Sequence, residues 1–187
     1  MKLLLVDNGS HFLEELQQAL SRHDVETVPF QQASDATGFD AVLLSGGSRF
    51  SVMEHEDDYA KELALIRRSS TPILGICLGF ELIGHAFGEE LSWLEAKRKG
   101  VMRVKKVLDD PIFKDVKTLD GFEAHRWGIK KVKNLIPLGI SRDGIEIIKH
   151  PERLIYGVQF HPEVWGDRLS GYKLLTNFLQ LVRKNEF

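Results

Sequence analysis

Residues 72–79 have the sequence Pro-Ile-Leu-Gly-Ile-Cys-Leu-Gly. The first part, up to Cys77, is typical of a buried strand, and residues 78–87 are predicted to form a helix. The pattern Gly-x-Cys-x-Gly between them is the form of a nucleophile elbow, a sharp turn from strand to helix. Glycine is needed two residues before and two after Cys77, because a side chain at either position would collide with the strained backbone.

The alternation of strand and helix begins earlier in the chain. Residues 3–7 form an apolar run that ends in a turn, and residues 12–20 repeat apolar side chains at helical spacing. Two further strands are predicted at 26–30 and 41–44, and a helix at 57–68. Each strand is nearly all apolar, as expected in a parallel sheet covered on both faces. We therefore predict an α/β fold with a doubly wound, mostly parallel sheet flanked by helices.

The second half of the chain has a different pattern. Shorter strand-like runs, separated by turn signals, are predicted at 101–107, 122–129, 138–141, 145–149 and 154–159. We interpret these runs as antiparallel additions and a return to the main sheet. An amphipathic helix at 171–183 closes the chain. Because no linker or repeat is found, residues 1–187 are expected to form a single domain.

Composition excludes several classes of protein. A hydrophobic fraction of 43% is enough for an ordinary core, which excludes disorder. With a net charge of −2 and no basic block, nucleic acid is not an expected partner. No apolar run is long enough for a membrane span, and Asp7 comes too soon for a signal peptide, so we expect a cytoplasmic protein. One cysteine and scattered histidines predict no disulfide, no metal ion and no other cofactor.

Cys77 is a candidate nucleophile because of its position at the predicted elbow. The N-terminus of the following helix would lower the pKa of its thiol, and the N–H groups there could stabilise a developing oxyanion. The alternative is that Cys77 is a small buried apolar residue, which is the usual role of a lone cysteine.

A thiolate nucleophile needs a base, and the segment Gln-Phe-His-Pro-Glu at 159–163 supplies a candidate at the end of a predicted strand. In an extended segment, residues two apart share a face, so Glu163 can contact the imidazole of His161 and fix its tautomer. The alternative interpretation of His-Pro-Glu is a surface turn.

The segment Ser-Gly-Gly-Ser at 45–48 follows a predicted strand, at the sheet edge where open α/β folds bind their ligands. One N–H group of this loop and the N–H group of Leu78 would form an oxyanion hole with two donors. The alternative is a plain turn. The loop is not a phosphate-binding P-loop, because the Gly-Lys-Ser/Thr ending is absent.

Taken together, in this order and at these separations, the three segments resemble the class I glutamine amidotransferase domain. They are Leu-Ser-Gly-Gly at 44–47, Gly-Ile-Cys-Leu-Gly at 75–79 and Gly-Val-Gln-Phe-His-Pro-Glu at 157–163. Residues 171–179 also resemble the closing helix of that family, so the resemblance covers nearly the whole chain. Within the family, the chain looks most like the stand-alone glutaminase subunits of the GMP synthase and anthranilate synthase type.

The resemblance implies a catalytic triad and a reaction. Cys77 would attack the side-chain amide of glutamine, His161 would transfer protons, and Glu163 would orient His161. The backbone N–H groups of Gly47 and Leu78 would hold the oxyanion, and water would hydrolyse the γ-glutamyl thioester after ammonia departs. Ammonia would pass to a synthetase. A chain of this length is too short to contain that synthetase as well, so it is expected to be a separate protein.

Two segments depart from the family pattern. Where the family usually has Cys-Leu-Gly-His-Gln, residues 77–81 are Cys-Leu-Gly-Phe-Glu, which resembles γ-glutamyl hydrolases. Glu81 therefore replaces a Gln that contacts the substrate, and an ionised carboxylate can only accept hydrogen bonds. A solvated acid in the first helical turn is the alternative role for Glu81.

The second departure is Ala-His-Arg-Trp at 124–127, where GMP synthase subunits carry Ser-His-Gly-Asp. By analogy this loop lies beside the glutamine backbone, with Arg126 or Trp127 contacting the substrate. His125 is expected to be a structural or substrate-wall histidine and not the base, because no carboxylate lies two residues after it.

Three functions stay open from the sequence. The leading hypothesis is a glutamine-hydrolysing amidotransferase subunit or a related stand-alone enzyme. The enzymatic alternative is a γ-glutamyl hydrolase that acts on γ-glutamyl peptides or amines, and the alternative of another class is a non-catalytic module that binds a metabolite or a partner. A surface around Trp93, Arg126, Trp127 and Trp165 is a candidate docking face, with burial of each tryptophan in the core as the alternative.

Overall fold

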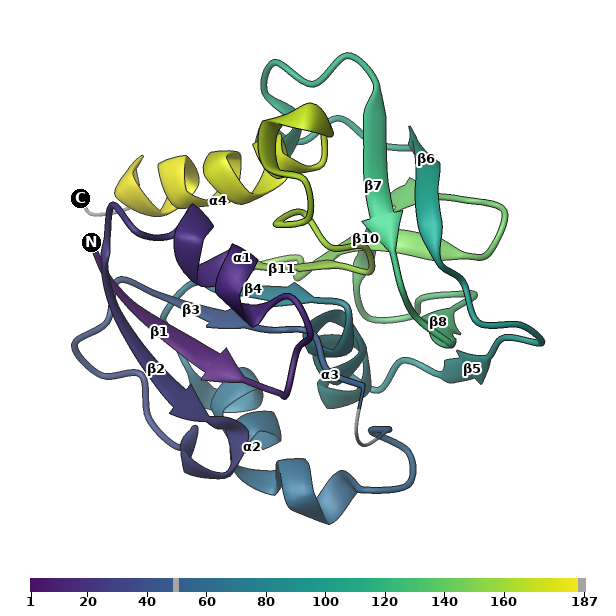
Figure 1. The fold of residues 1–187 in the computed structure, drawn as a ribbon. Coiled ribbons are helices and arrows are strands. Elements are labelled where there is room, and N and C mark those ends of the chain that lie inside the picture. Colours follow the sequence, from purple (N-terminus) through teal and green to yellow (C-terminus); the bar gives the residue numbers. More distant parts are fainter. Residues whose placement is uncertain (49–50, 185–187) are drawn as a thin grey trace.

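A twisted sheet runs through the centre of the molecule, with helices on both of its faces (Figure 1). The structure is a computed structural model and describes residues 1–48 and 51–184. Five parallel strands form one half of the sheet, in the spatial order β2 (Asp24–Pro29), β1 (Lys2–Asp7), β3 (Ala41–Leu44), β4 (Ile73–Ile76) and β11 (Ile155–Val158). This order places β4, which leads into Cys77, in the interior of the sheet between β3 and β11.

Antiparallel strands continue the sheet beyond β11. They are β10 (Ile145–Lys149), β9 (Ile136–Ile140), β6 (Gly100–Lys106) and β7 (Leu119–Glu123), in that spatial order. The short strand β8 (Trp127–Ile129) pairs with β10 and with β5 (Leu91–Trp93). The predicted fold, a mostly parallel α/β sheet with antiparallel additions in the second half, is confirmed.

The helices cover the two faces in pairs. Helices α1 (Leu13–Ala19) and α4 (Tyr172–Lys184) contribute to one apolar core, and α2 (Ala60–Arg68) and α3 (Leu78–Ala86) contribute to the other (Figure 1). The alternation of side chains along β1 explains the division, because Leu3 and Leu5 join the first core while Leu4 and Val6 join the second. Burial on both faces explains why the central strands are apolar throughout.

Several predicted elements differ in detail. Strand β2 is mostly exposed and not covered on both faces, because it forms the edge of the sheet beside β1. The predicted strand 122–129 is divided into β7 and β8, since the backbone between them turns away to pair with another loop. There Arg98 N–H donates to His125 O at 2.8 Å and His125 N–H donates to Arg98 O at 3.1 Å. Strand β5 was not predicted, because three residues carry too little periodic signal.

Short 3-10 helices occur in the connections. They are η1 (Phe30–Gln32), η2 (Glu56–Tyr59), η3 (Pro111–Phe113) and η4 (Gly166–Arg168). The predicted helix at 57–68 therefore begins as η2 and continues as α2. Among residues 1–48 and 51–184, no helix combines the length and apolar character that crossing a bilayer requires.

Candidate active site

Cys77 lies at a strained turn between β4 and α3. Its φ of 52° is in the left-handed region, which few residues other than glycine adopt. The turn is held by its N–H group, which donates to Val158 O on β11 at 2.8 Å. A Cβ atom on Gly75 would stand 2.4 Å from Gly79 O, and one on Gly79 would stand 2.5 Å from Leu44 O. The predicted need for glycine on both sides of Cys77 is confirmed.

The thiol environment differs from the sequence prediction. Burial raises the pKa of the Cys77 thiol above its ordinary value, and the nearby carboxylates of Glu81 and Glu163 raise it further. Hydrogen bonds from Leu78 N–H and the Gln159 side chain lower the pKa, but by less. The expected lowering by the helix N-terminus is therefore outweighed, because the side chain is only 3% exposed. Cys77 must pass its proton to a base before it can attack.

His161 and Glu163 provide such a base with its orienting carboxylate. The Nδ1 atom of His161 lies 2.8 Å from Glu163 Oε1, and both side chains are buried. His161 N–H donates to Phe122 O on β7 at 2.7 Å, and the ring of Phe12 packs edge-on against the imidazole, with centroids 4.7 Å apart. These contacts hold His161 and Glu163 in the interior, so the surface-turn alternative for His-Pro-Glu is wrong.

Gly46 lies close to both the imidazole of His161 and the side chain of Cys77. A Cβ atom on Gly46 would stand 2.6 Å from His161 Cε1 and 3.5 Å from Cys77 Cβ, so both side chains pack around this glycine. Cys77 follows the end of β4, and His161 follows the end of β11. The two residues lie close together because β4 and β11 are neighbours in the sheet. The structure thus brings Cys77, His161 and Glu163 together.

Gly46→Ala should test this proximity. The added methyl group would push the imidazole aside by some tenths of an ångström, and we expect activity to fall by about tenfold to a hundredfold, since small misplacements of catalytic groups are costly. The measurement is kcat for the release of glutamate from glutamine. Gly128→Ala is the matched control, because the nearest atom to its new Cβ is Leu94 Cδ2 at 4.0 Å. Equal kcat in both variants would contradict the arrangement.

The loop 45–48 is anchored beside the elbow by a buried polar network. Ser45 N–H donates to Val6 O at 3.0 Å, and Asn8 N–H donates to Ser45 Oγ at 2.9 Å. The side-chain amide of Asn8 donates to Glu62 Oε1 at 3.1 Å, and burial raises the pKa of Glu62 to about 8. A Cβ atom on Gly47 would stand 2.4 Å from Asn8 O and 2.6 Å from Leu78 Cδ2. Only glycine lets this backbone lie so close to Leu78.

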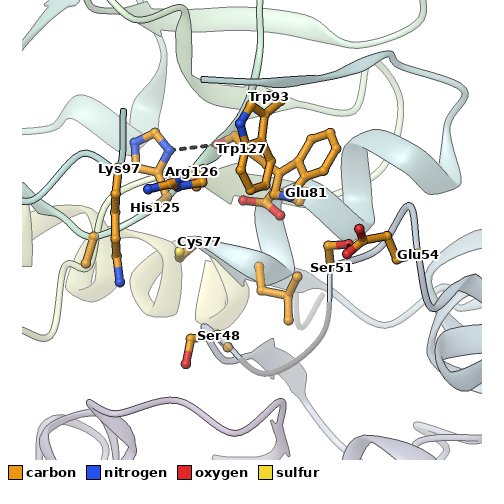
Figure 2. A pocket seen from close by; sticks show the side chains of 13 residues that line it. Ser48, Ser51, Glu54, Cys77, Glu81, Trp93, Lys97, His125, Arg126 and Trp127 are labelled. Carbon is orange, nitrogen blue, oxygen red and sulfur yellow. Dashed lines mark hydrogen bonds between the residues drawn. The ribbon is translucent and has the colours of Figure 1, made fainter. Parts of the chain in front are cut away.

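A pocket of about 300 Å³ opens over Cys77. It is lined by Gly47, Ser48, Ser51, Glu54, Cys77, Leu78, Glu81, Trp93, Lys97, Ala124, His125, Arg126 and Trp127. In Figure 2, Cys77 lies between Lys97 on one side and Ser51 and Glu54 on the other. The pocket brings together the predicted oxyanion residues and the three predicted substrate contacts. His161 does not line it and opens to a neighbouring pocket.

Glu81 points into this pocket from the first turn of α3 (Figure 2). It is only 4% exposed, so the interpretation as a solvated helix acid is wrong. Burial raises the pKa of Glu81 to about 7, while a hydrogen bond from Gln159 and the charge of His125 act in the opposite direction. That bond joins Gln159 Nε2 to Glu81 Oε1 at 3.3 Å. Near neutral pH the carboxyl group is therefore present in both forms, and the neutral form can donate a hydrogen bond.

His125 has a carboxylate partner that the sequence analysis missed. Its Nε2 atom lies 3.4 Å from Glu123 Oε2, and its Nδ1 lies 2.7 Å from Trp127 O (Figure 2). Burial lowers the pKa of His125, but Glu123 and the neighbouring acceptors outweigh it, so the pKa is raised overall. Glu123 precedes His125 by two residues, the same spacing that predicted the contact of His161 with Glu163. The pair braces the loop 124–126 at the pocket wall.

The residues of the predicted docking face do not form one cluster, because Trp165 lies apart from Trp93, Arg126 and Trp127. Trp93 is 54% exposed and Trp165 53% exposed, so burial in the core is wrong for both. The Trp93 and Trp127 rings pack edge to face with centroids 5.0 Å apart, because β5 pairs with β8, and the Arg126 guanidinium stacks over Trp93 at 4.9 Å. Trp165 packs instead against Phe122, outside the pocket over Cys77.

Gln159 is a residue of the site whose role the sequence did not predict. It is fully buried, it hydrogen-bonds Glu81 and it lies beside the Cys77 thiol. Its spacing of two from His161 at a strand end is the signal that could have indicated it. Among the residues that the structure describes, no group of three His, Cys, Asp or Glu side chains is arranged to hold a metal ion.

An elbow cysteine, a buried His–Glu pair and a glycine loop beside the helix N-terminus define a class of α/β enzymes in which a cysteine attacks a carbonyl carbon. The family model described as glutamine amidotransferase class-I matches residues 4–181. The chain belongs to the class-I glutamine amidotransferase family. The family, the fold and the enzyme class expected from the sequence are confirmed.

The relatives extend over nearly the whole chain. A glutamine-hydrolysing GMP synthase subunit from Pyrococcus abyssi is 31% identical over 96% of this chain and 97% of its own length. The corresponding subunit from Methanocaldococcus jannaschii is 29% identical over 96% of each chain. The crystal structure of a proposed GMP synthase subunit from Thermoplasma acidophilum has a TM-score of 0.87 and 26% identity, over 98% of this chain and 94% of that one.

Proposed function

We propose that this chain hydrolyses the side-chain amide of glutamine and supplies the ammonia to a separate synthetase subunit of the GMP synthase type. The observation that carries the proposal is Cys77, held at a strained elbow, with the His161–Glu163 pair close by, since one Cβ atom on Gly46 would contact both His161 and Cys77. The relatives support the choice of partner, because they are named as GMP synthase subunits and match this chain over 96% of its length.

The reaction follows from the positions of these groups. Cys77 gives its proton to His161, and the thiolate sulfur bonds to the amide carbon, whose oxygen becomes an oxyanion. The N–H groups of Gly47 and Leu78 stabilise that oxyanion. The C–N bond then breaks, His161 returns its proton to the leaving nitrogen, and ammonia departs. Water, activated by His161, hydrolyses the thioester and restores the thiol, giving glutamate.

The pocket over Cys77 offers complementary charges to the other end of glutamine. The guanidinium group of Arg126 pairs with the α-carboxylate, Trp127 forms an apolar wall, and Glu81 contacts the substrate from the floor of the pocket. Glu81 also acts on the nucleophile, because its negative charge raises the pKa of the Cys77 thiol. Ionisation of Glu81 should therefore oppose formation of the thiolate.

Glu81→Gln should change the pH dependence of glutamine hydrolysis. Since the pKa of Glu81 is raised to about 7, the carboxyl is largely neutral below that pH and charged above it. We expect the ratio of kcat/KM for Glu81→Gln to that of the unmodified chain to be close to one at about pH 6. At about pH 8.5 the ratio should rise by about threefold to tenfold. Titrations common to both proteins cancel in the ratio, and parallel profiles would contradict the role of Glu81.

The assay that tests the proposed function is the release of glutamate and ammonia from glutamine by the purified chain, with and without a GMP synthetase subunit. We expect release that requires Cys77 and that increases when the synthetase is present with its own substrates. If no glutamate forms under either condition while the protein is folded, glutamine is not the substrate.

A further inference from the structure

A carboxylic acid that takes no part in the proposed chemistry is buried near the loop 45–48. Glu62, in the first turn of α2, is 0% exposed. Its Oε1 atom accepts a hydrogen bond from the side chain of Asn8, while its Oε2 atom has no partner among the described residues. Burying a carboxyl with one hydrogen bond lowers the free energy of unfolding, because water satisfies both oxygens in the unfolded chain. A buried group that reduces stability is expected where the side chain serves function.

Asn8 connects the Glu62 carboxyl to the loop. Its side-chain amide donates one hydrogen bond to Glu62 Oε1 and another to Ser45 O, each at 3.1 Å. Asn8 directly follows β1 and Ser45 directly follows β3, and these two strands are parallel neighbours in the sheet. The amide group therefore ties the ends of two strands to α2 and is held in one orientation by two acceptors.

Ser45 fixes the orientation of the carbonyl group that follows it. Its hydroxyl oxygen accepts the N–H group of Asn8 at 2.9 Å, and the hydroxyl donates to Gly46 O at 2.9 Å. Ser45 is fully buried, so bulk water does not compete for either hydrogen bond. The carbonyl group of Gly46 is therefore directed at the protein interior.

The carbonyl group of Gly46 and the N–H group of Gly47 belong to one planar peptide. In a trans peptide these two bonds point in opposite directions, so a carbonyl directed at Ser45 turns the Gly47 N–H group away from Ser45. That N–H group donates to no acceptor among the described residues, and Gly47 lines the pocket over Cys77. A half-turn of this peptide would present a carbonyl oxygen, which repels an oxyanion, in place of a donor.

We propose that Glu62, Asn8 and Ser45 are positioning residues of the oxyanion hole. They hold the Gly46–Gly47 peptide with its N–H group toward the oxyanion. None of the three lines the pocket over Cys77, so each acts through the backbone of the loop. The effect falls on the steps in which an oxyanion develops and not on the binding of glutamine. This inference rests on the proposed function, because the oxyanion forms only when Cys77 attacks an amide.

Ser45→Ala tests the last contact of the network, because it removes the hydroxyl that bonds to Gly46 O. We expect kcat for glutamine hydrolysis to fall by about tenfold to a hundredfold, with little change in KM. Iodoacetamide alkylates Cys77 by displacement of iodide at a saturated carbon, which creates no oxyanion, so the alkylation rate should stay unchanged. Ser69→Ala is the matched control, since it removes a hydroxyl that accepts Thr71 N–H at 3.0 Å away from the pocket. It should change neither rate.

A second pair of variants tests the buried acid. Burial raises the pKa of Glu62 to about 8, so the uncharged carboxyl is its main form at neutral pH. Glu62→Gln is also uncharged, and its amide oxygen can still accept from Asn8, so we expect most of the kcat to be retained. Glu62→Leu has no acceptor, and its kcat should fall by about threefold to tenfold, with KM and the alkylation rate unchanged. The unfolding midpoint of each variant shows that it is folded at the assay temperature.

Two results would overturn the inference. One is equal kcat in Ser45→Ala and Ser69→Ala. The other is a parallel fall of hydrolysis and alkylation, which would mean that the network supports the elbow of Cys77 and not the oxyanion donor. Both results leave the proposed function standing when glutamate release by the unmodified chain requires Cys77. Absence of release by the unmodified chain would contradict the proposed function itself.

Discussion

Cys77→Ala should lower the hydrolysis of glutamine by at least about a thousandfold, because no other thiol is present to form the γ-glutamyl thioester. The residual rate should come from the oxyanion hole and from substrate binding alone. The measurement is single-turnover and steady-state release of glutamate, with bound glutamine measured separately by calorimetry. Glutamine should still bind, since Cys77 contributes to the reaction and not to recognition of the α-amino and α-carboxylate groups of glutamine.

The fold of the variant needs its own control, because Cys77 is buried at a strained position. Cys77→Ser keeps nearly the same volume and should show the same loss of activity with an unfolding midpoint close to that of the unmodified chain. If neither the unmodified chain nor Cys77→Ser hydrolysed glutamine and Cys77→Ser kept the full biological effect, the alternative of a non-catalytic binding module would be supported instead.

Glu163→Gln should give the second-largest loss, about a hundredfold to ten thousandfold in kcat with little change in KM. The Glu163 carboxylate accepts the Nδ1–H of His161 at 2.8 Å, which leaves Nε2 free to take the thiol proton and stabilises the imidazolium ion that forms. A glutamine amide is neutral and can present its NH₂ group to Nδ1, which favours the wrong tautomer. The loss should appear in pre-steady-state acylation as well as in steady-state kcat.

A matched control separates this effect from the cost of removing a buried charge. Glu89→Gln also neutralises a buried carboxylate, but Glu89 accepts N–H bonds from the backbone of residues 133–135 and lines neither the pocket over Cys77 nor the pocket to which His161 opens. It should lower stability without lowering kcat. If Glu163→Gln kept more than about a third of the kcat, another group would have to orient His161.

The elements that sequence patterns predicted are the local ones. The elbow around Cys77 was predictable because its signal lies within five residues, and the two glycines, the strand before it and the helix after it are where the pattern placed them. The His161–Glu163 contact was predictable for the same reason, since two residues in an extended segment share a face. Strand and helix bounds agree within a few residues wherever apolar periodicity runs over a full element.

The features that sequence patterns missed depend on burial or on pairing between distant segments. Glu81 is in the first turn of a helix, a position that is often solvated, and only the strands and loops around it bury the carboxyl and raise its pKa. The pocket to which His161 opens needs His11, Lys97 and His161 from three separate segments to lie together. The ion pair of Glu123 with His125 has the same spacing of two residues as the His161–Glu163 pair, but here the carboxylate comes before the histidine.

The sequence by itself therefore determined the family, the alternation of strands and helices, and the residues able to act as nucleophile and base. Each of these rests on spacings of a few residues, which set turn geometry, helix faces and strand faces locally. The tertiary structure alone decided the protonation environment of Cys77 and Glu81 and the opening of Cys77 and His161 to two neighbouring pockets. Those properties arise from the order of strands in the sheet and from the exclusion of water between its layers, and both depend on contacts between residues far apart in the chain.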